Sequence, residues 1–325
     1  MIVVRTPLRV SFLGGGTDFA DFFDHHKGMV LSTAIDKYIY VIIKQRFDEE
    51  IYINYSRKEI VDNIEDIQHE LVREAMRITG VDRGVEITTL ADVPSTGTGL
   101  GSSSSVTVGL LQALYSYKGQ LVTAETLAKN ACDIEIEICK KPIGMQDQYI
   151  SAYGGLREIS FDKDNSIVVS DLLLDPEVKR RLNRNLMLFY TNVSRPSESI
   201  LTEQKMNIDN STDTLIELSK LAKEGRNLLK SGDLDSFGEM LHKGWELKQG
   251  LASGVSNSVI NDLYNATREV GVIGGKIAGA GGGGFLLLYA PLGIQDDVRS
   301  VLSNLRELPF VFEPDGSKVV FNLGR

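Results

Sequence analysis

The stretch from Asp92 to Tyr117, DVPSTGTGLGSSSSVTVGLLQALYSY, limits the fold most narrowly, because a glycine-alternating loop runs there directly into a periodic apolar segment. Serine is a favoured residue immediately before a helix, so the sequence predicts a helix that starts near Ser102 or Ser103. Apolar residues recur at i, i+4, i+7, i+8 and i+11, the spacing of one buried helical face: Val106, Leu110, Ala113, Leu114 and Tyr117.

The glycines before this helix predict an anion site. Gly97, Gly99 and Gly101 carry no Cβ, so successive N–H groups can surround an anion at a helix N-terminus that bears about half a positive charge. A flexible linker is the alternative interpretation, but linkers do not usually turn at once into a strongly patterned helix. The loop is not a Walker A motif, because no Lys-Ser/Thr pair follows its last glycine. An oligophosphate is therefore the expected ligand.

Composition sets the class of protein. The 325 residues suggest about two domains, and a formal net charge of −9 argues against nucleic acid or an anionic membrane as partner. The chain shows no basic leader before an apolar run and no stretch of about 18 apolar residues, so we expect a cytoplasmic protein. None of the four histidines lies in a zinc signature, and Cys132 and Cys139 are expected to be core thiols.

The order of patterned segments predicts an α+β fold. Residues 2–12 and 28–55 have strand character and suggest a mixed or antiparallel sheet, whereas most of the second half reads as helices followed by short strands. The polar stretch 175–185 marks the change in composition. We therefore place a domain boundary near residue 183, which gives an N-terminal domain of residues 1–183 and a C-terminal domain of residues 184–325.

A second glycine cluster, Gly279 to Gly284, matches the dinucleotide-binding pattern G-x-G-x-x-G. That pattern must open a helix after a strand, but here the strand-like run Phe285 to Tyr289 follows the glycines. The sequence therefore disfavours a dinucleotide site at this cluster.

Phosphoryl transfer without a loop lysine requires a metal ion and carboxylates, and the sequence offers candidates. Asp147 follows a Pro-x-Gly turn, where its carboxylate can either accept a proton from a hydroxyl or cap the short helix that begins there. Glu135 and Glu137 both flank the apolar stripe of one expected helix, so the pattern alone leaves open which of them would meet a metal.

Four segments together resemble the motifs of the GHMP kinases, in order and in spacing. They are Pro7–Phe19 (PLRVSFLGGGTDF), Pro94–Ser104 (PSTGTGLGSSS), Ile143–Gln148 (IGMQDQ) and Lys276–Leu286 (KIAGAGGGGFL). The resemblance implies an N-terminal domain with a left-handed βαβ crossover and a ferredoxin-like C-terminal domain. ATP and the substrate are expected in the cleft between them.

The resemblance also implies roles for residues. Mg²⁺ is the expected cofactor, held by Ser103 and by Glu135, which lies twelve residues before Asp147 as in the family. Asp147 takes the place of the catalytic aspartate. Arg9 takes that of an arginine that assists the acceptor hydroxyl, with a structural ion pair as the alternative. The ATP phosphates are assigned to Gly97, Thr98, Gly99, Leu100, Gly101, Ser102, Ser103 and Ser104.

The acceptor is expected at the first and third motifs, which supply Gly15, Gly16, Thr17, Asp18, Gly281 and Gly282. Galactokinases carry a Glu-His pair where this chain has Gly15 and Gly16, which disfavours galactose. The GGGTD form resembles the branch that phosphorylates D-glycero-D-manno-heptose 7-phosphate, and also fucokinase-like enzymes. A phosphorylated acceptor needs a further anion site, for which Arg195 is the candidate; an arginine in a solvated loop is the alternative.

The expected function is thus ATP-dependent phosphorylation of the anomeric hydroxyl of heptose 7-phosphate to the 1,7-bisphosphate, for nucleotide-heptose and cell-surface glycan synthesis. A fucokinase- or galactokinase-like enzyme acting on an unphosphorylated sugar is the first alternative. A non-catalytic sensor that binds ATP and sugar is a distant one. The expected partners are ATP and a small sugar or sugar phosphate, and the sequence leaves the oligomeric state open, a dimer included.

Overall fold

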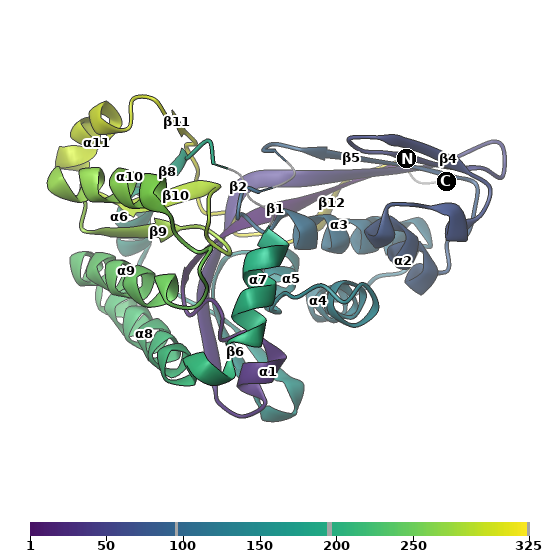
Figure 1. Cartoon of the computed structure of the whole chain (residues 1–325). Helices are drawn as coiled ribbons and strands as arrows, with labels where there is room; N and C mark the ends of the chain where they lie inside the picture. Colours follow the sequence, from purple (N-terminus) through teal and green to yellow (C-terminus); the bar gives the residue numbers. More distant parts are fainter. Residues whose placement is uncertain (95–96, 194–196, 324–325) are drawn as a thin grey trace.

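The computed structural model describes residues 1–94, 97–193 and 197–323. Its first sheet is organised by the long strand β2, which pairs with β1 along most of its length, with β6 near its start and with β5 near its end (Figure 1). The strands of this sheet are β1 (Ile2–Leu13), β2 (Gly28–Gln45), β3 (Ile51–Asn54), β4 (Lys58–Val61), β5 (Val85–Ala91), β6 (Leu156–Asp162), β7 (Ser166–Asp171) and β12 (Lys318–Asn322).

The pairing of these strands confirms a mixed sheet. β3 and β5 run parallel, and the other pairs among the described strands are antiparallel. The helix α2 (Glu70–Thr79) lies in the connection between β3 and β5. The left-handed crossover implied by the family resemblance would be this unit; its hand stays a prediction.

Helices cover one face of the first sheet. The helix α3 (Ser102–Tyr117) begins at the predicted serine and packs on β1 and β2. Of its predicted apolar stripe, Leu110, Ala113 and Leu114 are fully buried, and Val106 and Tyr117 are half-buried. Against α3 pack α2, α4 (Ala124–Cys132) and α5 (Gln146–Tyr153). After α4 the chain continues as a π-helical turn, Asp133–Ile138, and the short helix α1 (Ala20–Phe23) precedes β2.

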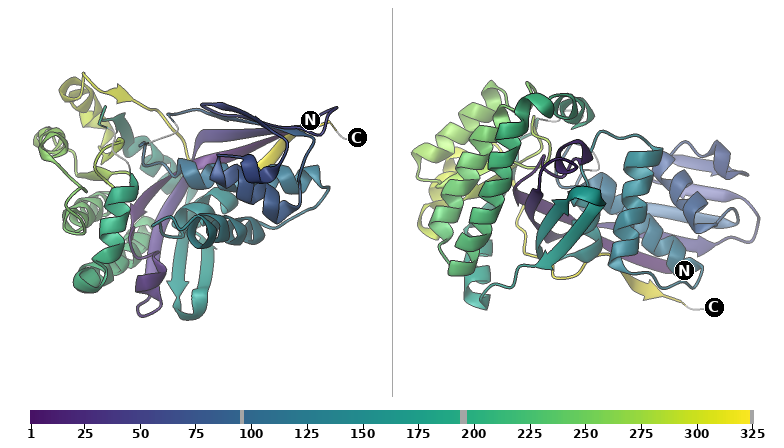
Figure 2. Two further views of the ribbon diagram at one scale, coloured as in Figure 1. Left: turned by 45° about the vertical axis from the view of Figure 1, so that its right-hand side comes forward. Right: turned by 90° about the horizontal axis from the view of Figure 1, so that it is seen from below.

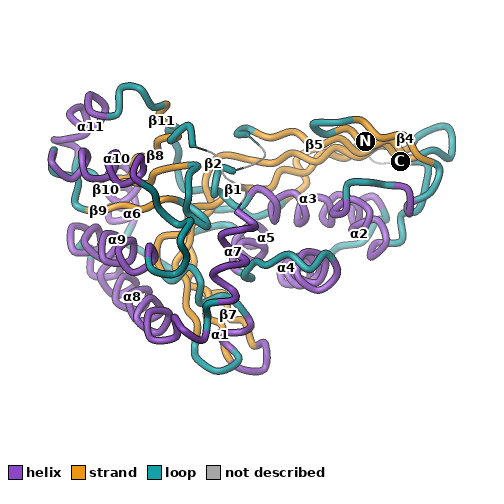
Figure 3. The backbone as a smooth tube through the Cα atoms, viewed as in Figure 1, coloured by secondary structure: helices purple, strands orange, loops and turns teal. Residues whose placement is uncertain are grey.

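The second sheet is antiparallel, in the order β11-β8-β10-β9. Figure 3 shows it beside helices that fill most of the second half of the chain. Its strands are β8 (Leu186–Tyr190), β9 (Gly274–Ile277), β10 (Phe285–Tyr289) and β11 (Arg306–Glu307). The helices are α6 (Pro176–Asn185), α7 (Ser197–Met206), α8 (Thr212–Ser231), α9 (Leu234–Gln249), α10 (Ser258–Glu269) and α11 (Gln295–Val301).

The polar stretch 175–185, on which the expected domain boundary rests, forms the helix α6. Asp175 caps this helix by accepting from the Glu177 N–H at 2.8 Å, and Pro176 fits its first position. Near the end of the chain, α11 ends at Val301 and the short strand β11 follows.

The core is continuous between the two halves. Helices α8 and α9 pack against each other and run side by side in the view from below (Figure 2, right), and α8 also packs against β1 and β2. A Cβ added to Gly225 of α8 would lie 2.5 Å from Leu13 Cδ1, so the helix needs glycine to approach the sheet. Leu13 and Leu31 of the first sheet thus belong to the same buried cluster as Leu221 and Phe237.

The last strand returns to the first sheet. β12 pairs antiparallel with β1, Ile2 opposite Asn322, and an isolated bridge joins Ile35 to Phe312. The segment expected as the end of a C-terminal domain of residues 184–325 is therefore built into the first sheet, while the division near residue 183 itself stays a prediction. No helix of the described residues is both long and apolar enough to cross a bilayer.

Candidate functional site

A cavity of about 690 Å³ lies where the two halves meet. Its walls come from β1, the Gly97–Ser104 loop, the turn before α5, the helices α7 and α9, and the Gly279–Gly284 segment. The predicted site residues that line it are Arg9, Gly15, Gly16, Asp18, Gly97, Thr98, Gly99, Gly101, Ser102, Ser103, Ser104, Asp147 and Gly281.

The two glycine-rich segments pack backbone against backbone. Gly99 has φ +74°, and a Cβ there would clash with the carbonyl oxygen of Ala278. A Cβ on Gly279 would in turn lie 2.6 Å from Gly99 Cα, and the Thr98 carbonyl accepts from the Phe285 N–H at 3.2 Å. The Gly279–Gly284 segment leads into β10, as predicted. Its backbone packs against the Gly97–Ser104 loop and holds that loop in place.

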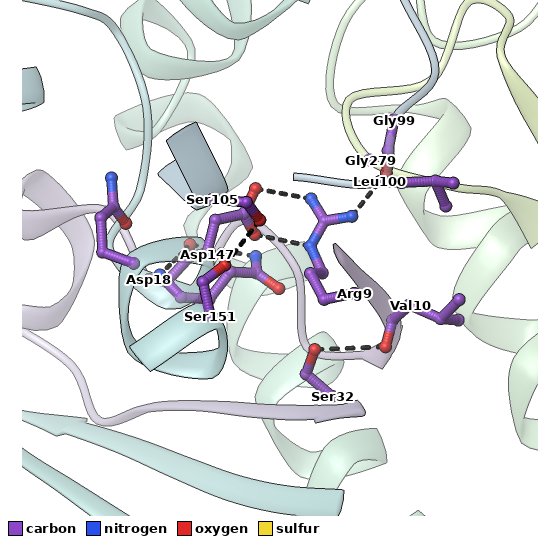
Figure 4. Close-up of polar contacts among 12 residues, drawn as sticks. Arg9, Val10, Asp18, Ser32, Gly99, Leu100, Ser105, Asp147, Ser151 and Gly279 are labelled. Carbon is purple, nitrogen blue, oxygen red and sulfur yellow. Dashed lines mark hydrogen bonds and ion pairs between the residues drawn. The ribbon is translucent and has the colours of Figure 1, made fainter. Parts of the chain in front are cut away.

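Arg9 and Asp147 form a two-pronged ion pair in the cavity wall (Figure 4). Arg9 Nε donates to Asp147 Oδ1 and Nη2 donates to Oδ2, each at 2.6 Å, while Nη1 donates to the Gly99 carbonyl at 2.5 Å. Arg9 is 4% exposed, whereas the Asp147 side chain is 22% exposed, so the carboxylate is the more accessible partner of the pair. The carboxylate is thereby fixed next to the glycine loop, with both oxygens on Arg9.

Glu135 lies directly behind the start of α3. Its Oε1 accepts from Ser103 Oγ at 2.6 Å and its Oε2 accepts from Gln148 Nε2 at 2.8 Å. Glu135 is completely buried, and burial raises the pKa of its carboxyl group. Glu137 is instead exposed and pairs with Lys140, so the π-helical turn that contains both residues turns Glu135 inward and Glu137 outward.

Ser103 and Glu135 supply hydroxyl and carboxylate oxygens, the ligand types that a hard divalent cation prefers. Two protein ligands suit Mg²⁺, which usually takes its remaining ligands from substrate phosphates and water. Among the described residues no group of three or more His, Cys, Asp or Glu side chains could hold a metal by itself. The residues present therefore fit a metal that arrives with a nucleotide.

Asp18 is also buried, but its oxygens are used within the protein. Its carboxylate accepts from the Gly16 N–H at 3.0 Å and from the backbone N–H and side chain of Gln146 at 3.2 and 3.0 Å. Burial raises its pKa, and the negative charge of Asp147 adds to that rise. A Cβ on Gly144 would clash with Asp18, which explains why the turn before α5 has glycine there.

Some predicted site residues do not line the cavity. Leu100 and Glu135 are fully buried, and Thr17 bonds to the Gly14 carbonyl at 2.8 Å. The N–H of Gly282 donates to the Val255 carbonyl at 2.7 Å. Direct contact of these four with a ligand or metal stays a prediction. Arg195 lies outside the described residues.

The structure adds two lysines that the sequence analysis missed. Lys248 of α9 is buried and donates to the Gly279 carbonyl, and its pKa is lowered to about 8, first by burial and then by the charge of Arg9. Lys141 Nζ lies 3.3 Å from Ser103 Oγ and 3.9 Å from Glu135 Oε1. A sequence signal existed for Lys248: it continues the buried face of α9 formed by Phe237, Leu241 and Trp245.

Comparisons with known proteins agree with this geometry. The model for the GHMP kinases N-terminal domain matches residues 58–155, and the model for the GHMP kinases C-terminal domain matches residues 226–306. A D-glycero-alpha-D-manno-heptose 7-phosphate kinase from Campylobacter jejuni is 28% identical over 305 residues, covering 89% of each chain.

Two further relatives show the range of the similarity. A bifunctional fucokinase/GDP-fucose pyrophosphorylase from Arabidopsis thaliana is 27% identical over 314 residues, which are 88% of this chain but 30% of that larger protein. A crystal structure of a D-glycero-D-manno-heptose 1-phosphate kinase from Bacteroides thetaiotaomicron has the same fold, with a TM-score of 0.84, 22% identity and complete coverage of both chains. With family matches in both halves and a shared two-domain fold, the chain belongs to the GHMP kinases and is a phosphotransferase that acts on a hydroxyl group.

Proposed function

We propose that this kinase uses ATP and Mg²⁺ to phosphorylate the anomeric hydroxyl of a sugar phosphate, with D-glycero-D-manno-heptose 7-phosphate as the acceptor and the 1,7-bisphosphate as the product. One observation carries the proposal. The Arg9–Asp147 pair lies in the wall of the same cavity as the glycine–serine loop, and Arg9 bonds to the loop itself at Gly99. A carboxylate and a phosphate-binding loop are thereby held at contact distance.

The proposed reaction uses these groups in fixed roles. Asp147 accepts the proton of the acceptor hydroxyl, whose oxygen then forms a bond to the γ-phosphorus as the bond to the β,γ-bridging oxygen breaks and ADP leaves. Arg9 orients Asp147 and provides positive charge where the alkoxide develops. Ser103 and Glu135 would hold Mg²⁺, which when bound neutralises phosphate charge.

Lys141 lines the cavity, and its ammonium group lies 3.3 Å from Ser103 Oγ. Its ammonium group also lies 3.3 Å from Glu70 Oε1. Since the loop itself carries no lysine, we assign to Lys141 a contact with the ATP phosphates.

The choice of acceptor rests on similarity and on the first motif. The Campylobacter jejuni relative acts on heptose 7-phosphate, and Gly15 and Gly16 leave room where a galactokinase has two side chains. We assign the 7-phosphate to Arg195 from the sequence, because this residue lies outside the described residues. The fucokinase-like alternative is supported by the Arabidopsis thaliana relative. The proposed place is the cytoplasmic synthesis of nucleotide-activated heptose for cell-surface glycans.

The test is a panel of acceptors with coupled ADP release and localisation of the new phosphate. It should include heptose 7-phosphate, mannose 6-phosphate, free mannose, fucose and galactose. We expect turnover with heptose 7-phosphate and phosphate at the anomeric position. If only free sugars react, both the 7-phosphate acceptor and the role of Arg195 are overturned. If the protein binds ATP but releases no ADP with any of these acceptors, a sensor is favoured.

A further inference from the structure

We propose that Ser11, Gln146 and Lys248 form a subsite that binds two neighbouring ring hydroxyls of the acceptor, above Gly15. This inference rests on the proposed function, because it assumes that a sugar enters the cavity. It adds three substrate-binding residues that the sequence motifs did not identify, and one of them comes from the opposite half of the molecule.

The three side chains point to one place. A Cβ placed on Gly15 would lie 3.8 Å from Gln146 Nε2, 3.9 Å from Ser11 Oγ and 4.0 Å from Lys248 Nζ. All four residues line the cavity. The missing side chain of Gly15 therefore leaves a space with polar groups on three sides, contributed by β1, α5 and α9.

Two polar atoms close to this place have no partner among the described residues. Ser11 Oγ and Gln146 Oε1 are buried and make no hydrogen bond to the described residues, and Ser11 is only 4% exposed. Nε2 is the Gln146 atom nearest to Gly15 and donates to Asp18 at 3.0 Å, which leaves Oε1 of the same amide without a partner among the described residues. Lys248 uses one of its three donors on the Gly279 carbonyl. Buried groups of this kind are normally satisfied, so a ligand is expected to satisfy them.

The chemistry of these groups selects hydroxyls over a phosphate group. Gln146 Oε1 can only accept a hydrogen bond, which suits a hydroxyl and repels a phosphate oxygen. Lys248 can only donate, and Ser11 can do either. Two adjacent hydroxyls of a sugar ring, one donating to Gln146 and one accepting from Lys248, fit this set. The subsite would then fix which hydroxyl of the ring faces Asp147.

Binding rather than turnover gives the sharpest test. We would measure by calorimetry the binding of heptose 7-phosphate, and of its 2-, 3- and 4-deoxy forms, in the presence of Mg²⁺ and a non-hydrolysable ATP analogue. The variants are Lys248→Met and Ser11→Ala. The matched control is Lys243→Met, on the same helix, where an exposed lysine pairs with Glu217 at 3.0 Å.

We expect Kd for the sugar to rise at least tenfold in Lys248→Met and severalfold in Ser11→Ala, with Kd for the ATP analogue unchanged in both and no effect in the control. For one deoxy form, Kd with the wild type should be about as high as Kd of the complete sugar with Lys248→Met. The change Lys248→Met should then raise Kd of that deoxy form no further. If Lys248→Met fails to bind the ATP analogue, the smaller change Ser11→Ala decides.

The outcomes separate the two levels of the argument. Unchanged sugar affinity in folded Lys248→Met and Ser11→Ala proteins would overturn the subsite and leave the kinase assignment intact. A wild type that binds the ATP analogue but no sugar of the acceptor panel would overturn both.

Discussion

The ion pair between Arg9 and Asp147 joins chain positions that are 138 residues apart, and it places a carboxylate whose two oxygens face one guanidinium. Such two-pronged geometry fixes direction as well as distance. The carboxylate of Asp147 is thereby held in one position in the cavity wall.

Replacing Asp147 with asparagine should lower turnover about 100- to 10,000-fold, because the amide keeps the shape but cannot take the proton. Affinity for an ATP analogue should persist. Steady-state kinetics and calorimetry check this, with the exposed Asp162, paired with Lys27, changed to asparagine as control. Turnover close to normal would remove Asp147 from the chemistry.

Glu135 and Glu137 lie two residues apart, one buried and one exposed, so the same substitution can be compared at both. The change Glu135→Gln should raise the Mg²⁺ concentration needed for half-maximal activity, because Glu135 bonds to Ser103 and is fully buried. The change Glu137→Gln should have no effect, since Glu137 is exposed. A magnesium titration decides, and identical curves for both variants would assign the metal to other residues.

The lowered pKa of Lys248 predicts that binding of the sugar depends on pH. Its pKa is lowered to about 8, with Arg9 lowering it further after burial while Asp18 and Asp147 raise it. Burial lowers the pKa of Lys276, and the charge of Lys248 lowers it further. Lys248 thus loses its proton as pH rises through about 8.

The KM for the sugar should therefore increase above pH 8 in the wild type, while KM for ATP stays level. The same rise should be absent from Lys248→Met, whose KM should be high at every pH. Parallel pH profiles of the two proteins would show that another group titrates. Because the unfolded lysine holds its proton to higher pH, stability should rise between about pH 8 and 10 from this residue.

Among the elements, the glycine–serine loop is shaped by contacts that only the folded chain provides. Gly99 and Gly119 have nearly the same backbone, φ +74° and φ +72°, but a Cβ on Gly99 would clash with Ala278 whereas Gly119 has nothing within 4 Å. Alanine substitutions at the two glycines therefore distinguish the cost of a left-handed backbone from the cost of a steric clash.

We expect Gly119→Ala to cost about 1–2 kcal/mol of stability, the ordinary price of a left-handed backbone for alanine. Gly99→Ala should cost more, and it should also weaken binding of an ATP analogue at least tenfold, because the loop must move away from Gly279. Urea unfolding and calorimetry measure both effects. Equal losses of stability and equal ATP affinities would contradict the backbone contact.

How far the sequence predicts these elements depends on the range of the interactions involved. Helix α3 and strand β10 follow from local pattern, so the helix start at Ser102 and the strand after Gly279–Gly284 are confirmed. Helix α6 was not predicted, because its polar residues were interpreted as a junction although they form a capped surface helix. The convergence of Lys248 on Gly15 depends on how α9 packs against β1, which no local spacing specifies.

At the scale of the whole molecule, the end of the chain ties the first sheet together. Glu313 accepts hydrogen bonds from Arg5 at 3.3 Å, from the Tyr38 hydroxyl and from the Asp315 N–H at 3.0 Å. Glu313 is buried, so its removal would leave a buried tyrosine hydroxyl without its partner.

The change Glu313→Ala should therefore cost about 2–3 kcal/mol, the range for a buried bond to a charged group. Glu307→Ala, which breaks a more exposed pair with Arg299 at 2.8 Å, should cost under about 1 kcal/mol. Chemical unfolding of both variants gives the comparison. A loss for Glu313→Ala no larger than that for Glu307→Ala would mean that the returning segment contributes little.

The return of β12 also brings the two described ends of the chain together. The Leu323 N–H donates to the Met1 carbonyl at 3.0 Å, at the edge of the first sheet away from α7 and α9 (Figure 1). A short peptide linker could therefore join the ends, and new termini could be opened in the exposed turn between α3 and α4, near Gly119. Such a circular permutant would keep every residue of the cavity in place, and fluorescent or affinity tags at the original ends would lie clear of arriving substrates.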